Sequence, residues 1–279
     1  MSTNPRLEEI ARRQMQDNLR EDSLKQRMAV VNDEILLSEE YEFLRELVSQ
    51  TNEAIEDVVS GWAGAKGMKI ENGRITEIRF TMAGGVKYIP EGIKYLTSLN
   101  CLLLMCGEIS DIPKNLPKEI RTLWLSSNNI QTVPEEIGEL TGLELMNLCG
   151  NQLASLPKSA RNLKNIWCLE LYDNRFEEIP EEIAGMKKLK HLYIQENQIK
   201  SLRPSICRLQ DLIVLDISNN PIAELPGDIV NLVSLEALHL EGTYLEYLPG
   251  ELAQMPRLEK IYVNRGVRFP RKLADKVKY

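Results

Sequence analysis

The sequence predicts an α/β solenoid, in which short repeats stack into a right-handed horseshoe with a parallel sheet on its concave side and a helical cap at its N-terminus. Three observations point to this fold. The same residue types recur every 23 positions, 64 of the 279 residues are Leu or Ile while only 4 are Phe, and apolar residues alternate with period 2 in each row. Branched aliphatic residues at a fixed period are typical of narrow, stacked layers.

One column of the repeat holds asparagine and another holds proline. In rows of 23 the prolines keep their step except where Arg203 takes the place and Pro204 follows one position late. A full row contains Leu143, Met146, Leu148, Asn151, Leu153, Leu156, Pro157, Ala160 and Leu163. The asparagine column contains Asn128, Asn151, Asn174, Asn197 and Asn220.

This row resembles the pattern of the leucine-rich-repeat family, L-x-x-L-x-L-x-x-N-x-L-x-x-L-P-x-x-I-x-x-L. The L-P-x-x-I-x-x-L part is similar to the intracellular Ras-group class, which has bacterial and archaeal members. The resemblance covers about three quarters of the chain. It implies a leucine-rich-repeat horseshoe and recognition of a protein through the concave face. The partner is not identified, because a fold does not specify a function.

Composition and repeat phase divide the chain into four segments. Pro5 suits the first turn of a helix and Ser38 suits an N-cap, so the N-terminal region is expected to be helical. Gly266 replaces the column asparagine near the other end, which indicates an atypical terminal repeat. The predicted segments are a helical charged arm over 1–40, an N-terminal cap over 41–74, eight leucine-rich repeats over 75–257 and a C-terminal cap repeat over 258–279.

Each repeat is expected to supply a short strand, a turn and a return segment. The apolar positions of the strand point into the core, because side chains alternate between the two faces of a sheet. The column asparagine is expected to be buried and to bond the backbone of the neighbouring turn, whose polar groups would otherwise lack partners. The five asparagines are therefore predicted to be structural.

The outward columns of the strands predict the composition of the concave face. An apolar and aromatic zone is expected toward the N-terminal repeats and an acidic zone further along. Contiguous exposed apolar residues mark interaction sites, although scattered surface residues, or a face covered by the protein's own arm, are the alternatives. The predicted protein-binding residues are Leu103, Met105, Trp124, Leu145, Glu170, Tyr172, Tyr193, Asp216 and Glu241, with Cys101 and Cys149 as further members of the apolar zone.

Charge and cysteine content limit the setting. A net charge of -7 and a pI near 5.2 argue against nucleic acid as the main partner. Five cysteines, an odd number, argue against a disulfide framework and favour a reducing, cytoplasmic location. No apolar targeting segment or membrane-spanning stretch is found, so no membrane association is expected. A monomer is expected, and delivery into a host cytosol is the alternative location.

No cofactor or metal site is expected. The two histidines, His191 and His239, lie two strands apart, and no C-x-x-C or H-E-x-x-H spacing occurs. One enzymatic alternative is a Cys–His hydrolase or transferase, because Cys168 and His191 share a column on adjacent strands, about 4.8 Å apart by sheet spacing. An open sheet offers no obvious oxyanion hole and excludes little water, which disfavours this alternative.

The sequence therefore predicts a non-catalytic scaffold for protein–protein interaction that binds a protein partner on its concave face. A bacterial effector that acts by binding a host protein is the second hypothesis. Both hypotheses require a binding surface and no reaction, so they differ in the source of the partner and share the same candidate residues.

Overall fold

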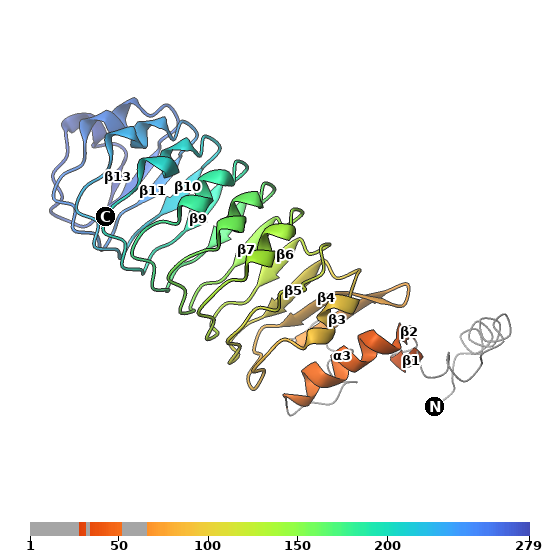
Figure 1. The fold of residues 1–279 in the computed structure, drawn as a ribbon. Coiled ribbons are helices and arrows are strands. Elements are labelled where there is room, and N and C mark those ends of the chain that lie inside the picture. Colours follow the sequence, from red (N-terminus) through yellow and green to blue (C-terminus); the bar gives the residue numbers. More distant parts are fainter. Residues whose placement is uncertain (1–27, 32–33, 52–65) are drawn as a thin grey trace.

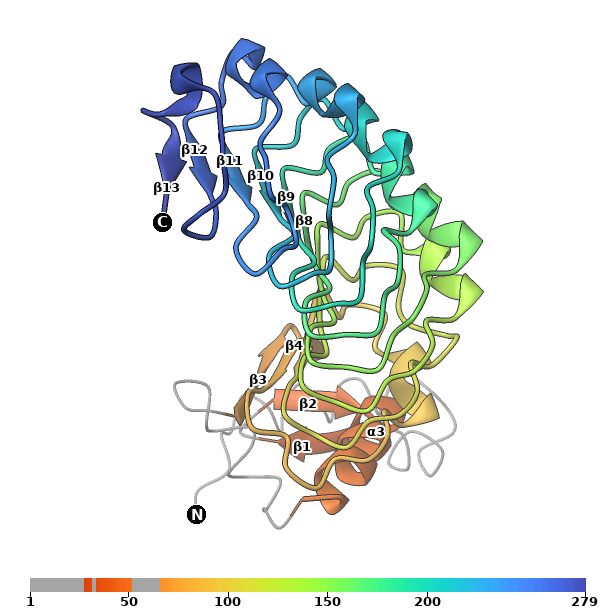
Figure 2. The same cartoon turned by 90° about the vertical axis from the view of Figure 1, so that its left-hand side faces the viewer.

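The computed structural model describes residues 28–31, 34–51 and 66–279 (Figure 1). Within them, one 11-stranded sheet has the order β13-β12-β11-β10-β9-β8-β7-β6-β5-β4-β3, and two more strands form a separate hairpin. Neighbours in the large sheet are parallel except for β3 and β4, which are antiparallel. The result is an open, curved solenoid with the sheet along its inner side and short 3-10 helices along its outer side (Figure 2).

From β6 onward the strands and outer helices alternate along the chain. The strands are β3 (Lys66–Glu71), β4 (Arg74–Phe80), β5 (Cys101–Leu104), β6 (Thr122–Trp124), β7 (Leu145–Asn147), β8 (Cys168–Glu170), β9 (His191–Tyr193), β10 (Val214–Asp216), β11 (Ala237–His239), β12 (Lys260–Tyr262) and β13 (Val277–Lys278). The 3-10 helices are η1 (Glu91–Tyr95), η2 (Glu135–Glu139), η3 (Lys158–Asn162), η4 (Glu181–Gly185), η5 (Pro204–Arg208), η6 (Gly227–Asn231), η7 (Gly250–Gln254) and η8 (Arg271–Leu273). One strand and one outer segment make one repeat.

The core runs through the middle residue of each three-residue strand, β6 to β12. Leu123, Leu192 and Leu215 are 0% exposed, while the residues on either side of each are half-buried. Successive repeats stack these side chains into one continuous apolar column. Because no single repeat can bury its own apolar side, stacking is the source of stability.

Proline positions the outer helices. Pro134 and Pro157 each precede a 3-10 helix with extended backbone, at φ -69° and φ -68°. Arg203 adopts the same conformation, φ -74° and ψ 142°, and Pro204 then becomes the first residue of η5. The shift of proline by one position therefore does not change the course of the backbone, because Arg203 adopts the same extended conformation and Pro is well tolerated in a first helical turn.

The column asparagines are buried and connect neighbouring repeats. The Nδ2 of Asn151 donates to Leu125 O of the preceding repeat at 2.9 Å and to Leu148 O of its own repeat at 3.0 Å. Its Oδ1 accepts from Ile130 N of the preceding repeat at 3.0 Å. We call this set the asparagine ladder, and the same bonding pattern holds Asn128, Asn174, Asn197 and Asn220.

The residue before each ladder asparagine has a left-handed backbone. The conformation costs a non-glycine residue about 1 kcal/mol or more, so it persists only where other bonds hold it. Here the asparagine that follows supplies those bonds. The left-handed residues are Ser127, Gly150, Asp173, Glu196 and Asn219, with φ between 52° and 61°.

Gly107 stands in the asparagine column of the shortest repeat. A Cβ at this position would lie 2.8 Å from Asn128 Oδ1 and 3.0 Å from Val86 O. The first ladder asparagine and the preceding turn therefore fill the space that a side chain would need. This explains why glycine occupies the column in this repeat.

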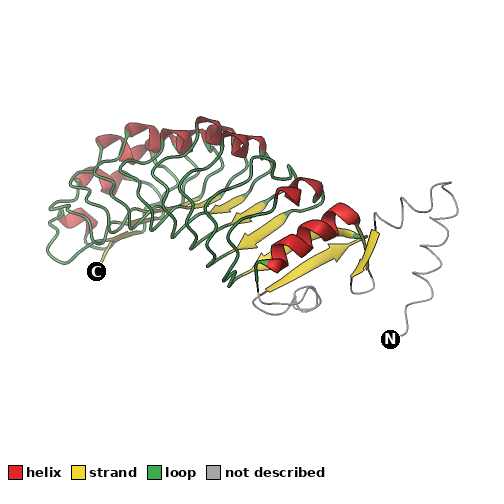
Figure 3. Ribbon diagram, turned by 60° about the horizontal axis from the view of Figure 1, so that its bottom comes forward, coloured by secondary structure: helices red, strands yellow, loops and turns green. Residues whose placement is uncertain are grey.

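Helix α3 (Ser38–Ser49) covers the N-terminal end of the solenoid (Figure 3). It buries Phe43, Leu44 and Leu47 against the first repeats. Glu40 is also fully buried, with Oε1 2.5 Å from Arg74 Nε and Oε2 accepting from Ile75 N at 2.9 Å. Burial raises the pKa of Glu40, because desolvation of the carboxylate outweighs these hydrogen bonds and the charge of Arg74.

The N-terminal region departs from the predicted helical arm. Residues 1–27 and 52–65 lie outside the described residues, so the arm and part of the predicted cap stay predictions. Strands β1 (Met28–Val31) and β2 (Glu34–Leu37) form an antiparallel hairpin where helix was predicted. Val30, Val31 and Ile35 explain the difference, because β-branched residues favour strands.

We expect Asn128→Ala to lower the free energy of unfolding by about 2–4 kcal/mol, because it removes the ladder bonds of one repeat and leaves a buried amide and carbonyls without partners. Urea unfolding followed by circular dichroism measures the change. The matched control is Asn129→Ala at the next position, where the side chain is exposed and a change within about 0.5 kcal/mol is expected. Equal losses in the two variants would contradict the ladder's role.

We expect Gly107→Ala to destabilise the fold by about 1–3 kcal/mol, because the new methyl group would press on Asn128 Oδ1 and a backbone carbonyl. The control is Gly227→Ala, where an added Cβ meets nothing within 4 Å. Thermal unfolding of both variants tests the argument. A Gly107→Ala protein as stable as the parent would show that the column tolerates a side chain there.

Candidate functional site

The strands of the inner sheet lie side by side (Figure 2), and their parallel register places the outward residues of successive strands in rows. Of the nine residues predicted for binding, six belong to two such rows. The other three, Met105, Tyr172 and Glu241, each lie two positions after the second-row residue of their repeat. The first row contains Cys101, Thr122, Leu145, Cys168 and His191, and the second contains Leu103, Trp124, Asn147, Glu170, Tyr193, Asp216 and His239. All nine therefore lie on or beside one surface, which we call the concave face.

The apolar part of the concave face is half-buried. Leu103, Trp124 and Leu145 are of intermediate exposure, and Trp124 Nε1 donates to Ser126 Oγ at 2.9 Å. Cys101 and Cys149 are instead buried, at 8% and 4% exposure. The expectation that these two cysteines add to the exposed zone is therefore wrong, because small side chains on a sheet are covered by larger neighbours.

Tyr172 extends the apolar part toward the acidic part. A hydrogen bond with the Cys149 thiol, together with burial, raises the pKa of Tyr172. Tyr193 lies on the next strand, and burial raises its pKa as well. Both phenols stay neutral and can donate hydrogen bonds, so each offers an apolar ring with one polar end.

The acidic part of the concave face contains carboxylates held by neighbouring side chains. Glu170 accepts a hydrogen bond from Asn147 Nδ2 and one from Cys168 Sγ at 3.8 Å. Burial raises the pKa of Glu170. Asp216 Oδ1 accepts from Ser218 N at 3.0 Å and from Ser218 Oγ at 2.7 Å. These contacts fix the positions of the two carboxylates on either side of Tyr193.

Glu241 lies near the C-terminal end of the same acidic part. His239 Nδ1 approaches Glu241 Oε2 at 3.7 Å, and the His239 ring stacks on Tyr262 with centroids 4.3 Å apart. The imidazole is therefore held between a carboxylate and an aromatic ring. This arrangement orders the edge of the acidic part.

Cys168 and His191 are directly opposite each other on β8 and β9, but their environments oppose nucleophilic chemistry. Burial and the charge of Glu170 raise the pKa of Cys168 to about 12. Burial and Lys190 lower the pKa of His191. The thiol hydrogen bonds to Glu170, and the buried His191 Nδ1 has no hydrogen-bond partner among the described residues. A thiolate–imidazolium pair is therefore disfavoured.

Trp167 is an exposed aromatic residue that the sequence analysis did not include. It immediately precedes β8 and is 40% exposed. Its ring meets His191 edge-on with centroids 5.9 Å apart, and His191 in turn stacks with Tyr193 at 6.4 Å. The sequence contains a signal for an unusual residue here. The position immediately before the strand is polar or charged in four other repeats, at Asn100, Arg121, Glu144 and Lys190.

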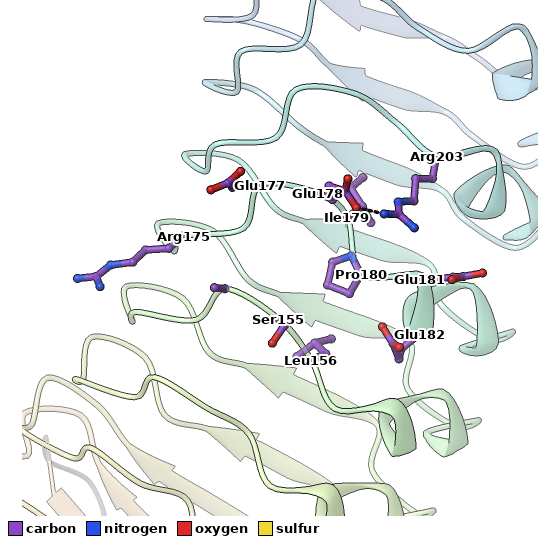
Figure 4. Close-up of a pocket in the computed structure, with 11 residues that line it drawn as sticks. Ser155, Leu156, Arg175, Glu177, Glu178, Ile179, Pro180, Glu181, Glu182 and Arg203 are labelled. Atoms are coloured by element: carbon purple, nitrogen blue, oxygen red, sulfur yellow. Dashed lines mark hydrogen bonds and ion pairs between the residues drawn. The ribbon is translucent and has the colours of Figure 1, made fainter.

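A separate cavity of about 460 Å³ lies between the loops that follow β7, β8 and β9 (Figure 4). It forms where Ala154 and Ser155 are small and the next repeat carries Glu177 and Glu178. Arg203 pairs with Glu178 across its rim. Its lining mixes both charges and includes none of the predicted binding residues, so it does not extend the concave face.

Within the described residues, no group of three or more His, Cys, Asp or Glu side chains is placed to hold a metal ion. The same part of the chain contains no helix with the length and apolar character needed to cross a bilayer. The five cysteines are unpaired.

Comparison with known families and structures adds independent information. A family model described as leucine rich repeat matches residues 141–199 and 187–245, and a second leucine-rich-repeat model matches residues 119–140. Among curated proteins, Toll-like receptor 9 of Sus scrofa is 33% identical over 69 residues, which is 24% of this chain and 7% of that protein.

Solved structures share the fold. A leucine-rich-repeat protein of Leptospira interrogans has a TM-score of 0.65 and 30% identity, covering 74% of this chain and 57% of that one. Internalin C2 of Listeria monocytogenes has a TM-score of 0.64 and 25% identity, covering 80% and 92%. The ectodomain of an Arabidopsis thaliana membrane receptor kinase has a TM-score of 0.69 and 20% identity, covering 86% and 31%.

The chain thus spans 57% of the Leptospira protein and 31% of the plant ectodomain, and the likeness at 20% identity concerns the fold alone. The matched repeats, the parallel sheet and the buried asparagines nonetheless agree with one another. This chain is a leucine-rich-repeat protein.

Proposed function

We propose that the protein is a non-catalytic scaffold that binds a protein partner on its concave face. The observation that carries this proposal is the row of half-buried aromatic and apolar side chains, Leu103, Trp124 and Tyr193, on β5, β6 and β9. Aromatic anchors that keep a polar end are typical of binding surfaces. A rigid sheet underneath fixes their spacing.

The rigid framework supports binding for an energetic reason. The strands are joined by ladder and sheet hydrogen bonds, so little backbone order has to be gained when a partner docks. Association then loses less conformational entropy, and more of the contact energy remains as affinity. The Arabidopsis ectodomain of the same architecture is described in complex with Casparian strip integrity factor 2, which makes binding a reasonable analogy from the fold.

The non-catalytic part of the proposal rests on the environment of Cys168. Its raised pKa and the lowered pKa of His191 both favour the neutral forms at pH 7. The concave face is open to water, whereas nucleophilic catalysis requires a preorganised site that excludes it. The unpaired thiols also support a reducing, cytoplasmic location as part of the proposal.

We expect the double variant Trp124→Ala/Tyr172→Ala to lose a specific partner that the parent protein recovers from native lysate, because two anchors of the concave face are removed. Affinity purification with quantitative mass spectrometry measures recovery. The thermal midpoint should stay within about 5 °C of the parent, since both side chains lie outside the core.

The matched control is Tyr95→Ala/Tyr244→Ala, which removes two aromatic residues that are exposed elsewhere, at 46% and 69%. This variant should recover the partner as the parent does. Equal recovery by the Trp124/Tyr172 variant and this control would remove the concave face as the binding site.

We expect iodoacetamide at neutral pH to alkylate Cys106 at least about a hundredfold faster than Cys168, because Cys106 is exposed while the pKa of Cys168 is raised to about 12. Peptide mass spectrometry over a time course gives both rates. In urea the five thiols should react alike. A Cys168 that reacts as fast as Cys106 in the folded protein would revive the enzymatic hypothesis.

A further inference from the structure

The concave face is segregated in charge. The outward segments of β5 to β7, residues 101–106, 122–127 and 145–150, contain no charged residue. The segments of β8 to β11, residues 168–173, 191–196, 214–219 and 237–242, contain five carboxylates and neither Lys nor Arg. These carboxylates belong to Glu170, Asp173, Glu196, Asp216 and Glu241. The protein has 34 Lys and Arg residues, and none of them lies in these segments of the seven consecutive strands β5 to β11.

The carboxylates of the concave face differ from those on the outside of the solenoid. On the outer and lateral surfaces, acidic residues pair with cations, as in Lys118–Glu139, Arg161–Glu182 and Arg203–Glu178. Among the described residues, none of the five concave carboxylates has a Lys or Arg partner, and Glu241 has His239 alone. The inner surface thus carries uncompensated negative charge that a cationic partner would neutralise.

Glu170 and Asp216 are placed to act together. They lie in one row on either side of Tyr193, so their strands are about 10 Å apart at the usual spacing. Hydrogen bonds from Asn147 and from Ser218 hold the two carboxylates. The burial that raises the pKa of Glu170 also means that its ionised form lacks full hydration, a cost that a neighbouring cation would offset.

A guanidinium group fits this row better than an ammonium group. It is planar, so it can stack on the Tyr193 ring, and its five N–H donors can reach carboxylates in more than one direction. A lysine offers a single compact charge that suits one carboxylate at a time. Leu145 on β7 and Trp124 on β6 lie on the N-terminal side of β8. They would contact apolar residues of the partner adjacent to the arginine.

We propose that the surface of β8 to β10 binds an arginine-containing segment of the protein partner, with the guanidinium group between Glu170 and Asp216 and against Tyr193. This inference rests on the proposed function and adds the chemistry of the ligand. The partner's apolar residues then lie over the uncharged strands β5 to β7. Charge complementarity sets the direction in which the segment lies along the solenoid.

One alternative occupant is a second copy of this chain, because residues 257–278 contain eight Lys and Arg against two acidic residues. Sedimentation velocity of the full chain at low and high salt separates the two cases. We expect a single monomer boundary in both. Salt-sensitive self-association that disappears in Glu170→Gln/Asp216→Asn would assign the surface to a second copy and overturn the proposal.

The main experiment uses a library of random dodecapeptides displayed on phage and selected on the full-length protein. We expect enriched peptides to contain an arginine next to apolar residues. Fluorescence anisotropy of one enriched peptide should show at least about tenfold weaker binding to Glu170→Gln/Asp216→Asn, because the charge is lost while the amide oxygens still accept from Asn147 and Ser218. Tyr193→Leu should weaken binding several-fold.

Two controls make the result specific. The variant Glu177→Gln/Glu251→Gln removes two exposed carboxylates away from the concave face and should leave affinity unchanged. A peptide with lysine in place of arginine should bind several-fold more weakly. Enriched peptides that lack basic residues, or an affinity that ignores Glu170 and Asp216, overturn this inference and leave the proposed function standing. Failure to enrich any peptide overturns both.

Discussion

The hydrogen bonds of the buried asparagines are the interaction on which the rest of the structure depends. Each amide of the ladder joins a carbonyl and an N–H of one repeat to the turn of the next, as Asn151 does with Leu125 and Ile130. These backbone groups lie inside the solenoid, where water cannot satisfy them, so the ladder fixes the spacing and register of the turns. The strand residues that follow this spacing, Glu170 and Tyr193 among them, reach the concave face in rows because the turns repeat without slippage.

Sequence was sufficient for the parts of the fold that repeat. A 23-residue period located the core positions and the ladder, because a stacked architecture imposes the same environment at the same column. It was insufficient where the chain does not repeat. The hairpin at Met28–Leu37 differs from the predicted helix, because the branching of Val30 and Val31 favours strands more than the weak apolar period favours a helix. The buried Glu40–Arg74 pair was likewise missed, because it joins residues from two elements that only packing brings together.

The candidate site shows the same division at the level of side chains. The 23-residue repeat predicts which residues lie on the outward side of each strand, and the observed register of the strands agrees with that prediction. It could not give burial, which depends on the size of neighbours, so Cys101 and Cys149 were expected at the surface and Trp167 was overlooked. The repeat pattern also could not predict the protonation state of the Cys168 thiol. Cys168 hydrogen bonds to Glu170, and burial together with the charge of Glu170 raises the pKa of the thiol and so lowers its reactivity.

The separation between inward and outward columns has a consequence for the history of such proteins. Substitution at an outward position such as Trp124 or Asp216 leaves the core leucines and the ladder intact, so the outward residues can change one by one while each intermediate still folds. Most of the retained identity between two relatives then comes from columns that never meet a ligand. The 30% identity to the Leptospira protein therefore reports a common architecture, and a common architecture carries no inheritance of a common partner.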